Sequence, residues 1–224
     1  MHMHPRTSCF LSAKLQLIFR LYKKKTYFSF IEYMTIEEHP LQPFLPVNGR
    51  VLFLGSFPPP KARWSMEWFY PNWINDFWRI QGLLHFNDKS YFEVKDGKRF
   101  DKERIVSFCE EKGMAFFDTA RKVCRLKDNA SDNFLEILEP TDVFALLEQM
   151  PSCAMVVTTG GKASEEICGY FNSQGIKVEI PKVGKSVSIS SKLWNGTWWR
   201  MPSTSRAYPM KLEKKAEYYK SLSI

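Results

Sequence analysis

Val51-Leu-Phe-Leu-Gly55 is a short apolar run that ends at a glycine and is followed by Ser56, Phe57 and three prolines, Pro58 to Pro60. An apolar run of this length between loop-forming residues is typical of a strand buried on both faces of a parallel sheet. In an open α/β sheet, ligands bind beyond the carboxyl ends of such strands. This stretch therefore predicts a parallel sheet and a functional loop directly after its first strand.

The chain that follows alternates between strand and helix patterns. Further buried strands are predicted over 114–118 and 154–159, and helices over 75–86, 101–112, 143–150, 162–172 and 209–222. Residues 185–199 predict a hairpin near the sheet edge with a turn at Asn195-Gly196. The last helix is expected to turn most of its lysines to solvent: Lys211, Lys214, Lys215 and Lys220. The alternation predicts an α/β fold with a mainly parallel sheet.

Length and composition restrict the class of protein. The 224 residues are enough for one domain with a real hydrophobic core, and 44% of them are hydrophobic, 15% aromatic and 25% charged. These fractions exclude a mostly disordered interaction protein. Lys14 and Arg20 interrupt the best N-terminal apolar stretch, so no membrane span is expected. We expect a soluble monomer.

The positive charge is concentrated at the N-terminus. The net charge is +8, and residues 1–33, with six basic residues and one acidic residue, hold +5 of it. We interpret Met34 as the functional start and residues 1–33 as a basic extension outside the fold, which leaves 34–224 as a single domain. The alternative is that 1–33 form a basic arm that contacts nucleic acid or a membrane surface.

The cysteines and histidines show no metal-ligand spacing. The five cysteines are far apart and form no C-x-x-C pair, which argues against a disulfide framework and a Cys-ligated metal. The four histidines likewise show no H-x-x-x-H or other metal-ligand spacing. We expect no metal and no cofactor, and a reducing, cytoplasmic location.

The loop after the first strand, residues 55–78, is unusually aromatic. It holds four of the seven tryptophans of the chain, stiffened by prolines. Such a loop is either a satellite core or, with Lys61 and Arg63 beside it, a base-stacking pocket next to a phosphate path. The sequence alone leaves both interpretations open.

A second unusual loop, Pro202-Ser-Thr-Ser-Arg206-Ala-Tyr208-Pro209, precedes the last helix. Its hydroxyl groups and backbone N–H groups are suited to hold a phosphate, and Arg206 or Tyr208 is suited to enter a duplex. Taken by itself, the segment is also an ordinary Ser/Thr turn and helix cap.

Together the two loops resemble the uracil-DNA glycosylase superfamily, most closely its hypoxanthine-DNA glycosylase-like branch. The matching motifs are Gly55-Ser56-Phe57-Pro58, Phe69-Tyr70, Asn75-Asp76-Phe77-Trp78 and Pro202-Ser203-Thr204-Ser205. The resemblance spans residues 48–222. It implies a three-layer α/β/α sandwich with a central, mainly parallel four-stranded sheet and a small edge hairpin.

The resemblance also implies an activity and a set of site residues. A protein of this kind binds DNA, flips out one deaminated base, hypoxanthine or uracil, and hydrolyses its N-glycosidic bond. Asn75 matches the residue that positions the attacking water, with Asp76 pointing elsewhere, and Phe77 matches the ring that stacks on the base. The remaining base-pocket residues are Gly55, Ser56, Phe57, Pro58 and Tyr70. The implied DNA-binding residues are Ser203, Thr204, Ser205, Arg206 and Tyr208.

Three departures from the pattern concern rate and substrate. Met201 stands where the fastest uracil-removing members have a histidine, Arg206 replaces a proline, and Pro59 replaces a glycine. Two functions therefore remain: a monofunctional glycosylase, and a catalytically weak or inactive nucleic-acid or nucleotide-binding protein that kept the pocket. The base excised and the preference for single or double strands do not follow from the sequence.

Overall fold

The computed structural model describes residues 36–95, 97–125 and 132–224, so the predicted extension 1–33 and the Met34 start lie outside the described residues. The elements, in chain order, are β1 (Ile36–Glu38), β2 (Val51–Gly55), η1 (Lys61–Arg63), α2 (Phe77–Phe86), α3 (Lys102–Lys112), β3 (Met114–Asp118), β4 (Ala120–Arg125), η2 (Asp132–Phe134), β5 (Leu135–Pro140), α4 (Val143–Glu148), β6 (Met155–Thr159), α5 (Gly161–Ser173), β7 (Lys185–Ser190), β8 (Asn195–Met201) and α6 (Leu212–Lys220).

The central sheet has the strand order β3-β2-β6-β8-β7. Strands β3, β2, β6 and β8 are parallel, and β7 pairs antiparallel with β8 at the edge. Every residue of β2 and of β3 is buried, as expected of strands covered on both faces. The mainly parallel sheet and its edge hairpin are therefore confirmed.

The turn of the edge hairpin differs from the prediction. Ser190 pairs with Asn195, and the connection is 191–194, so Asn195 and Gly196 begin strand β8 instead of forming the turn. The Ser191 hydroxyl accepts the N–H groups of Leu193 and Trp194 and so stabilises this longer loop. A Cβ on Gly196 would lie 2.3 Å from the Trp194 ring, which explains the glycine by close packing.

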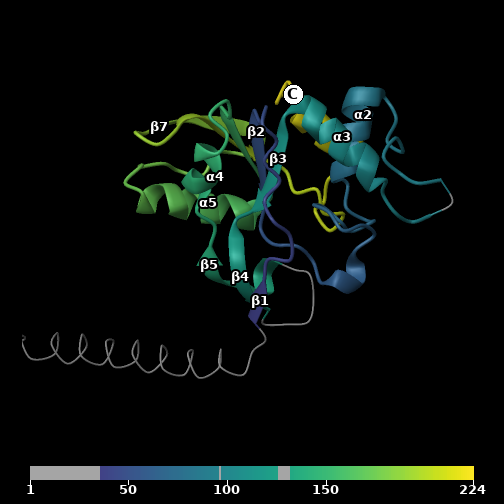
Figure 1. Cartoon of the computed structure of the whole chain (residues 1–224), viewed down its shortest axis with the longest axis horizontal. Coiled ribbons are helices and arrows are strands. Elements are labelled where there is room, and N and C mark those ends of the chain that lie inside the picture. Colours follow the sequence, from purple (N-terminus) through teal and green to yellow (C-terminus); the bar gives the residue numbers. More distant parts are fainter. Residues whose placement is uncertain (1–35, 96, 126–131) are drawn as a thin grey trace, which may run out of the picture.

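Helices cover both faces of the central sheet, which confirms the three-layer fold (Figure 1). Helices α4 and α5 lie on one face, and α2 and α3 lie on the other together with α6, which packs against α2. Two helices begin as the sequence predicts, because Asp101 and Asp142 accept the N–H groups of Arg104 and Ala145. None of the described helices is long and apolar enough to span a membrane.

A second sheet, not predicted from the sequence, lies beside the central one. It has three antiparallel strands in the order β1-β4-β5. Arg125 on β4 bonds to Glu37 on β1 at 2.7 Å and donates to the Pro58 carbonyl oxygen at 2.6 Å. The small sheet therefore supports the proline-rich loop that follows β2.

Candidate active site

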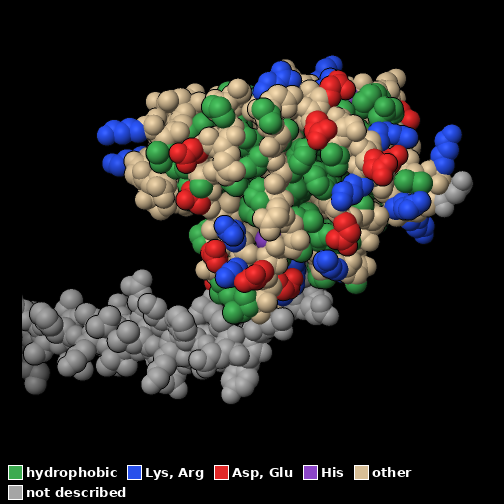
Figure 2. Space-filling model, in the orientation of Figure 1, with side chains coloured by type: hydrophobic (Ala, Val, Ile, Leu, Met, Phe, Trp, Pro, Cys, Tyr) green, Lys and Arg blue, Asp and Glu red, His purple; other side chains and the backbone are tan. Residues whose placement is uncertain are grey.

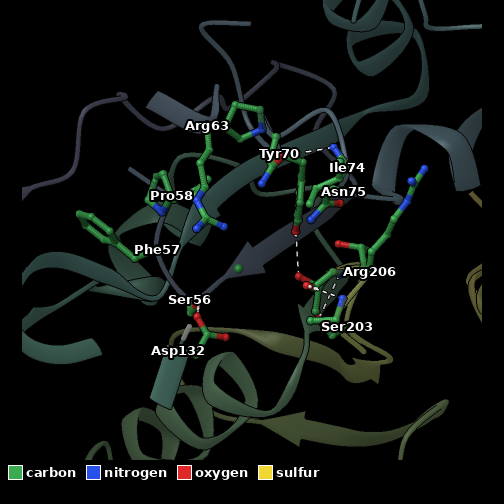
Figure 3. Close-up of a pocket in the computed structure, with 18 of the residues that line it drawn as sticks. Ser56, Phe57, Pro58, Arg63, Tyr70, Ile74, Asn75, Asp132, Ser203 and Arg206 are labelled. Atoms are coloured by element: carbon green, nitrogen blue, oxygen red, sulfur yellow. Dashed lines mark hydrogen bonds between the residues drawn. The ribbon is translucent and has the colours of Figure 1, made fainter. Parts of the chain in front are cut away.

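A cavity of about 650 Å³ lies where β2, β3 and β6 end. In the sheet, β3 lies on one side of β2 and β6 lies on the other, so the strand order reverses at β2. The cavity lies at this reversal, which is the usual ligand position in such sheets. Its walls come from the strand ends, from the loop 56–75 and from the loop 203–209 (Figure 3). The structure thus brings together the two loops that the sequence singled out.

Tyr70 presents the aromatic face of the cavity, and Phe77 lies beneath it. The two rings are stacked, with centroids 3.9 Å apart and planes 3° from parallel. Phe77 is completely buried and does not line the cavity, whereas Tyr70 does. In this structure Tyr70 lies against Phe77 and occupies the position facing the cavity, so base stacking by Phe77 stays a prediction and Tyr70 is a second candidate for that role.

The conformation of Tyr70 is held from two directions. Its backbone has a φ of 50°, in the left-handed region, which is uncommon for a residue other than glycine and is often associated with functional sites. Its hydroxyl lies 3.0 Å from the Thr159 hydroxyl at the end of β6. Burial raises the pKa of the Tyr70 phenol well above its ordinary value, so the ring stays neutral. Tyr70 is a fixed, uncharged stacking surface.

Asp118, at the end of β3, places a carboxylate at the cavity floor. Its Oδ2 lies 3.0 Å from Nε2 of His39, a buried ring surrounded by the Phe57, Phe69 and Phe117 rings. A Cβ on Gly55 would come within 2.5 Å of Asp118 Oδ1, so the glycine makes room for the carboxylate. Sequence analysis missed His39 as a partner, because 79 residues separate it from Asp118.

Asn75 and Asp76 are neighbours that face different surroundings. Asn75 lines the cavity, and its Oδ1 accepts the N–H of Phe77 at 2.9 Å, the contact expected of a side chain that caps a helix start. The same oxygen keeps a second lone pair. The Asp76 side chain points to Lys215, whose Nζ lies 2.8 Å from Asp76 Oδ2. It therefore points away from the Asn75 side chain, as the sequence analysis expects.

Lys215 corrects the prediction for the last helix. Its side chain has no exposed surface and donates to Asp76 Oδ2 and to the Ser205 carbonyl oxygen at 2.7 Å. Arg206 approaches the other Asp76 oxygen at 3.4 Å. A buried lysine in α6 therefore joins the late loop to the start of α2.

The late loop brings the five predicted DNA-binding residues to the cavity wall: Ser203, Thr204, Ser205, Arg206 and Tyr208. Thr204 is the most buried of them, at 2% exposed, and its carbonyl oxygen accepts the N–H of Asp76, which ties the loop to the start of α2. The helix begins at Leu212, three residues after the predicted Pro209, so the loop does not lead directly into a helix N-terminus.

Asp132 adds a second carboxylate at the cavity. Ser56 donates a hydrogen bond to it at 2.6 Å and so connects the first loop to η2 (Figure 3). Exclusion of water by the surrounding protein raises the pKa of Asp132, the Ser56 hydrogen bond opposes this, and the charge of Asp118 adds to it. This aspartate was not among the predicted site residues. The predicted residues Gly55, Ser56, Phe57 and Pro58 also line the cavity.

Two further properties limit the chemistry of the site. Among residues 36–95, 97–125 and 132–224, no group of three or more His, Cys, Asp and Glu side chains is arranged to hold a metal ion. On the face of the molecule that Figure 2 shows, basic and acidic side chains alternate and do not form one basic stripe.

Comparison with known proteins supports the fold. No protein-family model matches the chain, and none of the curated proteins matches it in sequence. The chain is similar to the solution NMR structure of a "putative Uracil DNA glycosylase" from Methanosarcina acetivorans, with 17% identity and a TM-score of 0.55. The similarity covers 85% of this chain and 100% of that one. The protein therefore shares the α/β fold of that structure.

Proposed function

We propose that this protein is a monofunctional DNA glycosylase that acts in base-excision repair on a deaminated base. The observation that carries the proposal is the cavity itself: at the carboxyl ends of parallel strands it combines a rigid aromatic face, Tyr70, with a carboxylate, Asp118, and an amide, Asn75. A volume of about 650 Å³ gives room for a flipped nucleotide. The glycosylase name of the M. acetivorans neighbour agrees with this proposal.

Asp118 supports a deaminated base as the substrate. Deamination of adenine or cytosine replaces an acceptor ring nitrogen by an N–H and an amino group by a carbonyl. A carboxylate accepts that N–H, whereas it would face the lone pair of the unmodified base. Hydroxyl groups of Ser203 and Thr159, which also line the cavity, are suited to donate to the carbonyl. We therefore infer hypoxanthine, as in the branch that the sequence resembles, and uracil as candidate bases.

The reaction needs a positioned water and support for charge that develops on both products. When the bond between C1′ and the base nitrogen breaks, its electron pair leaves with the base and positive charge develops on the sugar. A water oxygen then bonds to C1′, and the proton that this water loses balances the proton that the base takes up. Asn75 cannot be a strong base, so its proposed role is to hold the water through the second lone pair of Oδ1.

One observation favours the alternative function. Because Asn75 Oδ1 already accepts the Phe77 N–H, part of its hydrogen-bonding capacity serves the helix. A protein that uses Asn75 for this alone would bind a flipped base or a nucleotide with little or no catalysis.

The test is release of free base from oligonucleotides that carry hypoxanthine, uracil, xanthine or a mismatched normal base, in single-stranded and double-stranded form. We expect release of at least one deaminated base and no release of adenine or cytosine. Tight binding to lesion-containing DNA without any release would support the alternative. If the protein neither bound lesion-containing DNA nor released a base, both functions would be contradicted.

A further inference from the structure

Arg63 carries a positive charge that the proposed mechanism has not yet used. Its side chain extends from η1 into the cavity, with Tyr70 and Asn75 on the other side (Figure 3). Two cationic residues are found among the described residues that line the cavity, Arg63 and Arg206. Arg206 is in an ion pair with Asp76, whereas no described carboxylate lies within ion-pair distance of Arg63.

The segment that carries Arg63 is anchored by its backbone. The Arg63 N–H bonds to the Pro60 carbonyl oxygen at 2.9 Å, and Trp64 Nε1 donates to the Pro59 carbonyl oxygen at 2.7 Å. Ser65 bonds twice to the Pro71 carbonyl oxygen, through its N–H and its hydroxyl. These bonds fix the backbone from which the exposed Arg63 side chain extends, so the guanidinium has only its own side-chain torsions to order when a ligand enters.

The leaving base needs a cation that the rest of the site does not supply. Negative charge develops on the base as the glycosidic bond breaks. Met201, which stands where the sequence pattern of fast uracil-removing members has a histidine, is fully buried and does not line the cavity. His39 lies behind Asp118 and is bonded to it. Arg63 is therefore the cavity-lining cation that is free to face the base.

We propose that Arg63 is a catalytic residue that stabilises the departing base. Its guanidinium keeps its positive charge at physiological pH and presents planar N–H donors, which match the carbonyl oxygen on which the leaving base concentrates negative charge. The proton balance is that of the proposed reaction, because arginine accepts and releases no proton. This inference rests on the proposed glycosylase function and goes beyond the phosphate path expected from the sequence.

The experiment compares single-turnover excision by the wild type, Arg63→Met, Arg63→Lys and the matched control Lys61→Met. Lys61 lies on the same turn, pairs with Glu67 and does not line the cavity. We expect Arg63→Met to reduce the excision rate by about a hundredfold. Arg63→Lys should retain part of the rate, and Lys61→Met should stay within about threefold of the wild type. Affinity for lesion-containing DNA should change much less than the rate.

The leaving group supplies a readout that a structural role would not change. The loss in Arg63→Met should be smaller for 5-fluorouracil than for uracil, because the anion of 5-fluorouracil is intrinsically more stable. An unchanged rate in Arg63→Met would overturn the inference. A loss in DNA affinity as large as the loss in rate, with a shallower salt dependence of binding, would also overturn it, because these two changes together indicate a phosphate contact. Absence of excision by the wild type would instead overturn the proposed glycosylase function.

Discussion

The two loops that enclose the cavity are held in place by different forces. The loop 55–75 is fixed by prolines, backbone hydrogen bonds and aromatic packing, including the bond from Trp78 Nε1 to the Phe69 carbonyl oxygen. The loop 202–209 also has backbone hydrogen bonds, such as that from the Asp76 N–H to the Thr204 carbonyl oxygen, but charge is added to them through Lys215 and Arg206 on the two oxygens of Asp76. The packing of the first loop is insensitive to a polyanion, whereas the exposed Arg206 contact of the second loop is open to competition by one; the buried Lys215 contact is not.

This difference assigns separate tasks to the two loops. The residues that we propose for the chemistry, Asn75, Tyr70 and Arg63, belong to the loop with the rigid support. Arg206 lies at the tip of the other loop with an exposed side chain, where DNA phosphates would compete with Asp76 for it. A rigid wall for the chemistry and an exposed arginine for phosphate contact fit the base flipping that we propose.

The largest expected effect comes from removing the charge beneath the late loop. Lys215→Met leaves Asp76 buried without its main partner, so we expect the free energy of unfolding to fall by about 3–5 kcal/mol. Denaturant unfolding measures this. The control is Lys214→Met, at an exposed lysine that pairs with the exposed Glu217, and this variant should cost less than about 1 kcal/mol.

A double variant separates charge from packing. Lys215→Met together with Asp76→Asn removes both charges of the pair, and we expect it to recover a large part of the lost stability. If Lys215→Met proved as stable as Lys214→Met, the late loop would not depend on the buried charge and the contrast between the loops would fail.

The next effect tests which ring faces the ligand. Tyr70→Leu removes the aromatic surface of the cavity and should weaken binding to lesion-containing DNA by about 1–3 kcal/mol, with undamaged duplex binding nearly unchanged. Phe77→Leu should lower the melting temperature and leave the preference for lesion-containing DNA intact, because its ring is buried. The reverse pattern in the two variants would return the stacking role to Phe77.

The smallest expected effect concerns the basic N-terminal residues. A protein that begins at Met34 should match the full chain in solubility, melting temperature and DNA affinity, because both loops and the cavity belong to residues 55–209. Fluorescence anisotropy over a range of salt concentrations measures the affinity. A large loss of affinity with a shallower salt dependence would establish residues 1–33 as a basic DNA-binding arm.

The sequence predicts the central sheet and the location of the cavity because both depend on local patterns. Fully apolar runs identify the buried strands, and the Gly and Pro residues after β2 mark the loop at its carboxyl end. The small sheet was missed because β4 and β5 alternate exposed, half-buried and buried residues and carry no comparable apolar run.

The residues whose surroundings differ from the sequence prediction depend on the three-dimensional packing. Lys215 looks like a solvent-facing lysine until the fold brings Asp76, 139 residues away, against it. Tyr70 lies in the loop before α2 and Phe77 begins α2, and the stacking of the two rings leaves Tyr70 on the cavity side. A local sequence pattern does not predict these contacts.

The most direct test of the proposed chemistry is a paired measurement on Asn75→Ala, of melting temperature and of single-turnover excision on the best substrate. If Asn75 holds the attacking water, the excision rate of the variant should fall by about a hundredfold or more. Loss of the bond to the Phe77 N–H should lower the free energy of unfolding by about 1 kcal/mol, so the melting temperature should stay close to that of the wild type. A lowered melting temperature with an unchanged excision rate would contradict the account and leave Asn75 as a helix cap.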